Sequence, residues 1–204
     1  MVISHGYQFI FIHNYKVAGT SVREALQVYT IPPKESYPNW IRQKLHLLPQ
    51  SSDFPDHISA PQLQAKLAPK YFDKYYKFSF VRNPWDWQVS LYHYARQQKD
   101  HHQHAMTMAM SFEEYILWRV NHEVRLQKNF MYDAQGNCLV DYIGKMEAIE
   151  SGFKHITKHI GIDAVLPHSN KSSHKHYQDY YTPETRELVA VHFKEDIDLF
   201  DYKF

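Results

Sequence analysis

The chain of 204 residues contains one cysteine, Cys138, and so cannot form a disulfide bond within itself. A single cysteine favours a reducing compartment, which makes a cytoplasmic protein the default expectation. The sequence does not open with the basic and then apolar segment of a secretory signal peptide. Its longest apolar runs, such as Phe9–Ile12, are far shorter than a membrane-spanning helix, so no membrane association is expected.

The chain also lacks an excess of charge of either sign, because its formal net charge is +1 at pH 7. No broad field therefore attracts nucleic acid or a membrane surface, and any anion site must be built locally. The hydrophobic fraction of 44% and the length fit one globular domain over residues 1–204. Nothing in the sequence indicates an oligomeric state.

Fifteen histidines raise the question of a metal site. The densest clusters are residues 100–104 and 174–176, and both lie in polar, loop-like sequence. No pair of cysteines or His-Glu-x-x-His helix accompanies them, so no metal is expected.

Short apolar runs alternate with helical patterns along the chain. Strands are predicted at Phe9–Ile12, Tyr76–Val81 and Leu139–Ile143, the last ended by Gly144. Helices are predicted at residues 21–29, 59–67 and 149–160, after Pro84 and Ser111, and from Thr182 through Ile197. This alternation predicts an α/β fold with a central, mainly parallel sheet flanked by helices.

The first candidate anion loop follows strand Phe9–Ile12 and runs to Ser21, where a helix begins. A helix N-terminus offers unpaired N–H groups and a partial positive charge, which together bind phosphate or sulfate. Lys16 adds a cation, Gly19 a close backbone approach, and Thr20 a hydroxyl. The order departs from a Walker A motif, because the lysine precedes the glycine. A plain strand-to-helix turn with serine as N-cap is the alternative.

A second candidate anion site follows strand Tyr76–Val81. Arg82 leaves the strand tip, and Ser90 lies about two helical turns into the next helix. An arginine fork and a hydroxyl could converge there on a second phosphate. The alternative is an ion pair between Arg82 and Asp86, with Ser90 solvated. Two such segments suggest a ligand with two separated anionic groups.

These residues resemble the sulfotransferases that use 3′-phosphoadenosine 5′-phosphosulfate (PAPS), especially the carbohydrate type. The family's first loop usually reads Pro-Lys-Thr-Gly/Ala-Gly-Thr-Ser, and residues 15–21 match it except that Tyr15 replaces Pro and Val17 replaces Thr. Its second motif is matched at Arg82, Asn83, Pro84, Ser90 and Tyr92, with Trp87 where an arginine is common. Further similarity lies in residues 142–147, 170–172 and 177–204.

The resemblance implies a three-layer, P-loop-like fold and a sulfuryl transfer from PAPS to a hydroxyl acceptor, a small molecule or a glycan. It implies that Lys16 stabilises the leaving phosphate and that residues 16–21 (Lys16, Val17, Ala18, Gly19, Thr20 and Ser21) hold the 5′-phosphosulfate. It assigns Arg82 and Ser90 to the 3′-phosphate, and Lys171 and Ser172, with Asn170, to the nucleotide side. The lack of an anchor and of disulfides resembles soluble bacterial members.

An acceptor hydroxyl needs a general base, and His57 is the best candidate. Family members that act on glycan 2-hydroxyls carry a similar His-x-Ser segment between the two phosphate motifs, and residues 57–59 match it. Asp56 is the alternative base, and a surface histidine the alternative role. Glu147 is expected to cap a helix, and Trp85 to pack in the core rather than flank the nucleotide.

Two other functions compete with sulfuryl transfer. One is a nucleotide-dependent phosphotransferase, which the absent Walker A order disfavours. The other is a non-catalytic nucleotide- or glycan-binding protein, which the presence of Lys16 and His57 disfavours.

Overall fold

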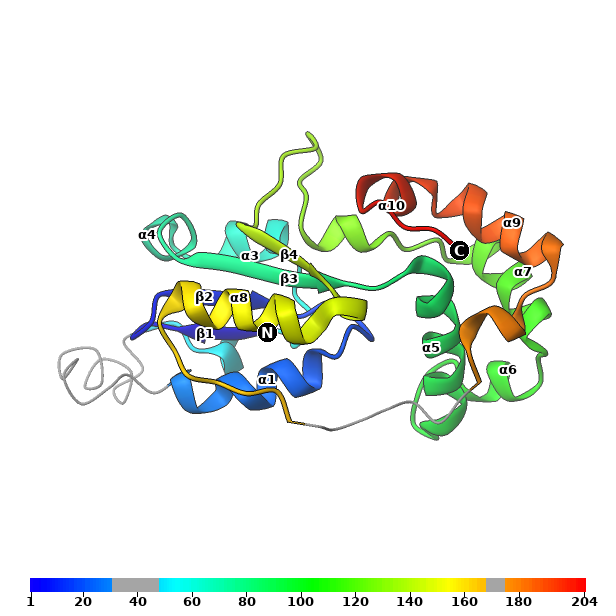
Figure 1. Cartoon of the computed structure of the whole chain (residues 1–204), viewed down its shortest axis with the longest axis horizontal. Coiled ribbons are helices and arrows are strands. Elements are labelled where there is room, and N and C mark those ends of the chain that lie inside the picture. The colour runs from blue at the N-terminus through cyan, green and yellow to red at the C-terminus, as the bar shows by residue number, and fades with distance from the viewer. Residues whose placement is uncertain (31–47, 168–174) are drawn as a thin grey trace. The chain divides into compact units, whose positions relative to one another are not determined.

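The structure, a computed structural model, describes residues 1–30, 48–167 and 175–204, which fall into two compact units. The first unit comprises Met1–Val81 and Asn129–Ser169 and contains the sheet, whereas the second comprises Arg82–Lys128 and Asn170–Phe204 and is helical (Figure 1). The sequence predicted one domain over residues 1–204, and each unit has its own set of packed elements.

The first unit is built on a sheet whose four described strands have the order β1–β2–β3–β4. β1 (Val2–Ser4) pairs antiparallel with β2 (Phe9–Ile12). β2 pairs parallel with β3 (Tyr76–Val81), which pairs parallel with β4 (Tyr142–Lys145). The predicted α/β fold with a mainly parallel sheet is therefore confirmed, although the three-residue β1 was not predicted.

The boundary predicted for the last strand was wrong. β4 begins at Tyr142 rather than Leu139, and Gly144 lies inside it rather than at its end. A Cβ atom at Gly144 would lie 2.4 Å from Cε1 of Phe80, so the glycine makes room for an aromatic ring of the neighbouring strand. Packing across the sheet, rather than a chain reversal, explains the glycine.

Helices cover both faces of this sheet. On one face, fully buried Phe9, Phe11, Phe78 and Phe80 form a core with α1 (Gly19–Gln27) and α8 (Ile149–Ile160). The alternate residues of each strand point the other way. On that face the Lys77 ammonium lies 5.4 Å from the ring centroid of Phe72, the last residue of α4 (Pro69–Phe72). α4 follows α3 (Ala60–Lys66) in the chain. The three-layer arrangement predicted for the fold is thus present in the first unit.

Local capping signals set several helix starts. Ser59 and Gln62 form the predicted capping box of α3, and Ser111 and Glu114 form that of α7 (Phe112–His122). The first helix begins at Gly19, two residues earlier than predicted, and a short 3₁₀ turn (η1, Val28–Thr30) follows it.

The second unit consists of α5 (Pro84–Gln97), α6 (His104–Met108), α7, α9 (Pro183–His192) and α10 (Lys194–Leu199). The sequence predicted one helix from Thr182 through Ile197, but the helix breaks at Phe193, whose φ is −109° and ψ 19°. After this break Asp196 is fully buried, and its carboxylate accepts backbone hydrogen bonds from Gln127 and Lys128.

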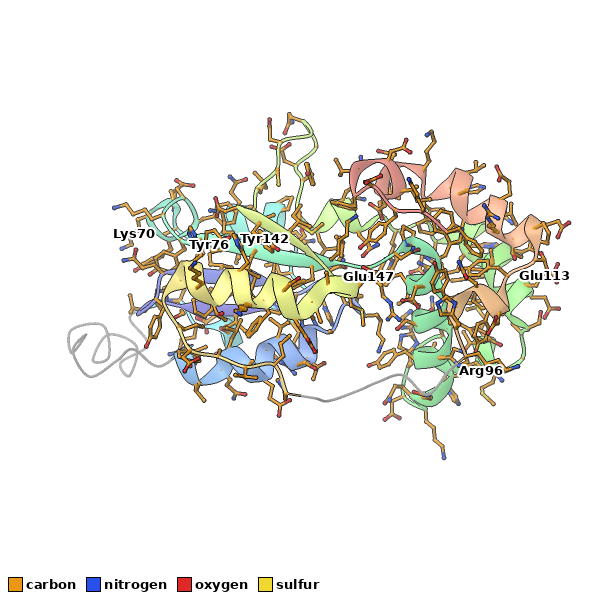
Figure 2. All side chains as sticks on the ribbon, viewed as in Figure 1. Lys70, Tyr76, Arg96, Glu113, Tyr142 and Glu147 are labelled. Atoms are coloured by element: carbon orange, nitrogen blue, oxygen red, sulfur yellow. The ribbon has the colours of Figure 1, made fainter. Side chains whose placement is uncertain are left out.

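The remaining short elements are 3₁₀ turns at Ser51–Asp53 (η3), Gln127–Phe130 (η4), Met146–Ala148 (η5) and Tyr177–Tyr180 (η6). Tyr76 and Tyr142 lie on adjacent strands beside α8 (Figure 2). Each stacks on a histidine of that helix, Tyr76 on His159 at 4.1 Å and Tyr142 on His155 at 4.9 Å between ring centroids.

Candidate active site

The first anion loop is anchored at its base to the sheet. The Ser79 hydroxyl of β3 donates to the Ile12 carbonyl, the last of β2, at 2.8 Å. Fully buried Asn14 accepts from the Tyr15 amide at 2.7 Å and donates to the Phe80 carbonyl at 3.5 Å. These bonds hold the first loop residues against β3, so the chain enters the loop from a fixed position.

The loop backbone contains two residues with left-handed torsion angles just before α1. Lys16 and Ala18 adopt positive φ values of 55° and 57°, and Val17 between them does not. Such alternation of handedness turns successive N–H groups toward one point. Ala18 is the N-cap of α1, and its methyl side chain makes no capping hydrogen bond. The first turn also contains no acidic residue, so no carboxylate of that turn would repel a bound anion.

The loop side chains divide into core and surface. Val17 is fully buried in the hydrophobic core, which leaves only its backbone for a ligand. Ser21 is buried, Lys16 is half-buried, and Thr20 is exposed. The predicted ligand residues therefore differ in exposure, and Lys16 and Thr20 have the more accessible side chains.

Contact with a neighbouring side chain also requires glycine at position 19, and the sequence did not reveal this contact. A Cβ atom there would lie 1.9 Å from both Cδ2 and Nε2 of His13, so the imidazole ring lies directly against the Gly19 backbone. His13 is 6% exposed, and its Nδ1 has no hydrogen-bond partner among the described residues. Burial, followed by the neighbouring His57, lowers the His13 pKa to about 3, so this ring is neutral at physiological pH.

His57 lies beside the same loop. Its Nδ1 is 2.9 Å from the His13 carbonyl oxygen, and its ring centroid is 4.3 Å from that of His13 and 4.0 Å from that of Tyr15. A carbonyl only accepts hydrogen bonds, so Nδ1 of His57 carries the proton and Nε2 carries the lone pair. Burial lowers the His57 pKa, partly opposed by this hydrogen bond, so the neutral form dominates at pH 7.

Asp56, the alternative base, is engaged elsewhere. Its carboxylate accepts from Arg23 of α1 at 3.0 Å, and its side chain is 66% exposed. Partial burial raises the pKa of this carboxyl, but the hydrogen bond and charge of Arg23 outweigh it and lower the pKa overall. A carboxylate stabilised in this way is a weaker base, which favours His57 for that role.

In the second unit, Arg82 forms the ion pair that the sequence left as an alternative. Its Nε donates to Asp86 at 2.7 Å and its Nη2 at 2.9 Å, and the Arg82 side chain is 6% exposed. Ser90 is buried rather than solvated on the helix surface. The pair fixes the plane of the guanidinium, and one guanidinium supplies five N–H donors, more than one carboxylate accepts.

Other predicted residues have different outcomes. Asn170, Lys171 and Ser172 lie outside the described residues. Ala148 is the N-cap of α8, so Glu147 lies one residue before the cap position that was predicted for it. Trp85 is buried as predicted, and Trp87 is buried too, so both indoles belong to the core.

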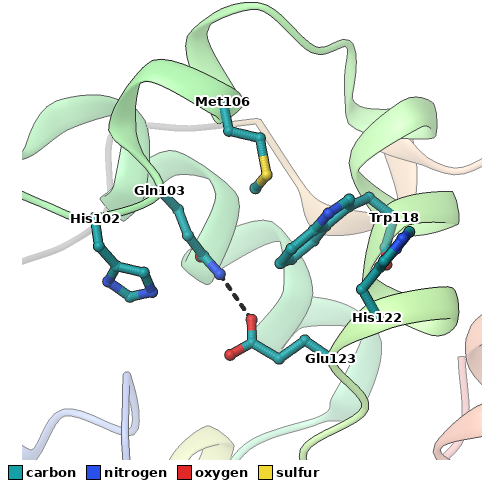
Figure 3. A pocket seen from close by; sticks show the side chains of 6 residues that line it. All are labelled: His102, Gln103, Met106, Trp118, His122 and Glu123. Carbon is teal, nitrogen blue, oxygen red and sulfur yellow. Dashed lines mark hydrogen bonds between the residues drawn. The ribbon is translucent and has the colours of Figure 1, made fainter.

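A cavity of about 400 Å³ lies in the second unit between α6 and α7 (Figure 3). Its lining combines an indole, a thioether, an amide, two imidazoles and a carboxylate, from Trp118, Met106, Gln103, His102, His122 and Glu123. The Gln103 amide donates to Glu123 at 2.7 Å. No group of three His, Cys, Asp or Glu side chains within the described residues is placed to hold a metal ion.

None of the described helices has the length and hydrophobicity needed to cross a membrane.

The sequence of the chain was compared with known proteins and with family models. A protein of Archaeoglobus fulgidus named "Uncharacterized protein" is 29% identical over 121 residues, which cover 53% of this chain and 87% of that protein. No solved structure matches the chain. The model of the sulfotransferase family matches residues 1–203, across both units. The chain therefore belongs to the sulfotransferase family.

Proposed function

We propose that the protein transfers the sulfuryl group of PAPS to a hydroxyl of a saccharide acceptor. One observation carries the proposal: the alternating backbone of residues 16–18 leads into a helix start without a side-chain cap, with Lys16 inside the loop. Backbone N–H groups at such a place bind a sulfate or phosphate without a high net charge. Membership of the sulfotransferase family supports the same chemistry.

In this proposal the loop of Lys16, Val17, Ala18, Gly19, Thr20 and Ser21 holds the 5′-phosphosulfate. Val17 contributes through its backbone, since its side chain is in the core. Arg82 and Ser90 bind the 3′-phosphate, with Asp86 orienting the guanidinium. Lys171 and Ser172 belong to the nucleotide side by resemblance to the family.

We propose His57 as the general base. Its tautomer supports this role, because the bond from Nδ1 to the His13 carbonyl leaves the lone pair on Nε2. Its neutral state at pH 7 supports it as well, because only an unprotonated imidazole can accept the proton of the acceptor hydroxyl. General-base catalysis by a positioned side chain contributes roughly 10²–10⁴-fold in rate.

The chemical step is an in-line displacement at sulfur. Nε2 of His57 takes the proton of the acceptor hydroxyl while the acceptor oxygen forms a bond to sulfur. The bond from sulfur to the bridging phosphate oxygen breaks, and its electron pair stays on the 5′-phosphate of the departing 3′-phosphoadenosine 5′-phosphate (PAP). Lys16 stabilises that charge, and one charge-assisted hydrogen bond contributes about 1.5–3 kcal/mol.

The proposed acceptor is a saccharide. The saccharide comes from the resemblance to carbohydrate sulfotransferases. The indole that lines the cavity between α6 and α7 is compatible with stacking against a sugar ring. A cytoplasmic location, and a single domain formed by both units, remain predictions.

Binding and transfer with a matched pair of lysine variants test this function. Calorimetry should detect PAP binding to the wild type but not ATP binding, and labelled sulfate should pass from PAPS to desulfated glycosaminoglycan. Lys16→Ala should lower transfer at least tenfold, whereas Lys70→Ala, an exposed lysine of α4, should not change it. Binding of ATP in place of PAP would favour a phosphotransferase, and transfer unaffected by Lys16→Ala would remove Lys16 from the mechanism.

A further inference from the structure

A buried glutamine forms two hydrogen bonds to the backbone of Arg82. Gln127 is fully buried, and its side-chain Oε1 accepts from the Arg82 amide at 2.9 Å. Its Nε2 donates to the Arg82 carbonyl at 2.7 Å. A side-chain amide thus forms two bonds to one residue, as a neighbouring strand would, at the point where β3 has ended.

A second buried residue fixes the glutamine. The fully buried carboxylate of Asp196 accepts from the Gln127 amide at 2.6 Å and from the Lys128 amide at 2.9 Å. These bonds hold the start of η4 in place, and with it the Cα atom from which the Gln127 side chain extends. Asp196 lies 69 residues further along the chain, so a distant helix holds this position.

Hydrogen bonds therefore fix both the backbone and the guanidinium of Arg82. Gln127 fixes its backbone, and Asp86 fixes its guanidinium through two hydrogen bonds of 2.7 and 2.9 Å. Asp86 lies four residues further on in α5 and sets the direction of the side chain only if the Arg82 backbone is itself fixed. Groups that recognise a ligand must keep their geometry within about 0.5 Å, which neighbouring packing and hydrogen bonds provide.

We infer that Gln127 is a positioning residue that determines the preference for a nucleotide with a 3′-phosphate. The inference rests on the proposed function, in which Arg82 binds that phosphate. In this inference Gln127 acts through Arg82 and not by contact with the nucleotide. Loss of these two bonds would weaken the hold on the Arg82 backbone, and the binding advantage that a fixed guanidinium gives to one phosphate would be reduced.

The test compares two nucleotides that differ by one phosphate, PAP and adenosine 5′-phosphate. Gln127→Leu keeps a similar volume and removes both bonds to Arg82. Gln88→Leu is the matched control, because Gln88 is also a fully buried glutamine but binds Arg119 rather than Arg82. Calorimetry of the full chain gives the ratio of the two dissociation constants for each protein.

The wild type should bind PAP more tightly than adenosine 5′-phosphate. Gln127→Leu should lower that ratio about tenfold or more while changing the affinity for adenosine 5′-phosphate less than about threefold, and Gln88→Leu should leave the ratio unchanged. If Gln127→Leu and Gln88→Leu both weaken the binding of PAP and of adenosine 5′-phosphate by the same factor, the effect comes from a general loss of folding. That result would overturn the inference.

Two results distinguish a failure of this inference from a failure of the proposed 3′-phosphate site. If Arg82→Lys lowers the ratio and Gln127→Leu does not, the inference is wrong and the 3′-phosphate site stands. If the wild type shows no preference for PAP, the proposed site at Arg82 fails, and the inference fails with it. Should Gln127→Leu not fold, Gln127→Glu keeps an acceptor for the Arg82 amide but loses the donor, and a ratio equal to that of the wild type would refute the inference.

Discussion

The phenol ring of Tyr15 lies nearly parallel to the imidazole of His57, with 4.0 Å between the ring centroids and 29° between the planes. The sulfotransferases that this loop resembles usually have proline at this position. Here the tyrosine covers one side of the proposed base, and Phe130 packs edge-on against the tyrosine at 5.4 Å. The departure from the family pattern therefore adds an aromatic wall beside His57, which reduces contact between the imidazole and water.

Removal of this wall should raise the His57 pKa. Burial is the main cause that lowers it, so Tyr15→Ala should move the pKa back toward 6.5. The acidic limb of the rate profile should then shift to higher pH, since the neutral imidazole is the active form. Nuclear magnetic resonance titration of the imidazole checks the shift, and Tyr15→Phe, which keeps the ring, should leave it near the wild-type value.

Loss of His57 should affect turnover rather than donor binding. His57→Ala should lower the transfer rate by roughly 10²-fold or more, with PAP affinity within about twofold of the wild type. His155→Ala is the control, because His155 is an exposed histidine of α8 in the same unit. A loss of PAP binding with unchanged turnover of the bound complex would contradict the assignment of the base.

The contact between His13 and Gly19 should appear as coupling in a double-mutant cycle. Gly19→Ala should destabilise the protein by about 2 kcal/mol or more, because the new Cβ would lie 1.9 Å from the His13 ring. The same change in a His13→Ala protein should cost at least 1 kcal/mol less, since the ring is gone. Denaturant unfolding measures all four proteins, and additive effects would show that the ring does not cause the constraint.

Asp196 should give the protein a specific dependence of stability on pH. Burial raises the Asp196 pKa from 3.8 to about 6, although its two backbone hydrogen bonds oppose the shift. Between pH 4 and 6 the folded protein keeps a proton that the unfolded chain loses, so this residue lowers the unfolding free energy as pH rises. The change is on the order of 1–3 kcal/mol and is complete above pH 6.

Asp196→Asn should remove that contribution, because the amide does not titrate. The unfolding free energy of the variant relative to the wild type should therefore rise between pH 4 and 6 and stay level from pH 7 to 8. Urea unfolding at several pH values measures this difference. A relative stability that is constant from pH 4 to 7 would contradict a raised pKa for Asp196.

Features set by neighbours in the sequence could be predicted from the sequence. The starts of α3 and α7 follow from Ser59 and Ser111, whose partners lie three residues away. The alternation of strands and helices predicted the parallel sheet, and the loop composition predicted the first helix, although its start at Ser21 was two residues later than the observed start at Gly19. Each of these depends on local geometry, which the order of residues specifies directly.

Features set by distant contacts could not be predicted. Gly144 was taken for a strand end because its reason, the ring of Phe80, lies 64 residues earlier in the chain. The role of Gln127 depends on Arg82, 45 residues earlier in the chain. His13 and Gly19 lie in one loop, but their contact depends on how the loop folds back, which the residue order does not specify. A buried amide that binds backbone leaves no periodic pattern in the sequence, so only the folded chain identifies it.

The edge strand β1 limits how copies of this protein can associate. In β1 the N–H of Ile3 donates to the Ser51 hydroxyl at 2.9 Å rather than to β2. A strand from another molecule would have to displace this bond to extend the sheet at that side, and it would find an edge of three residues. An oligomer that continues the sheet across β1 is therefore disfavoured.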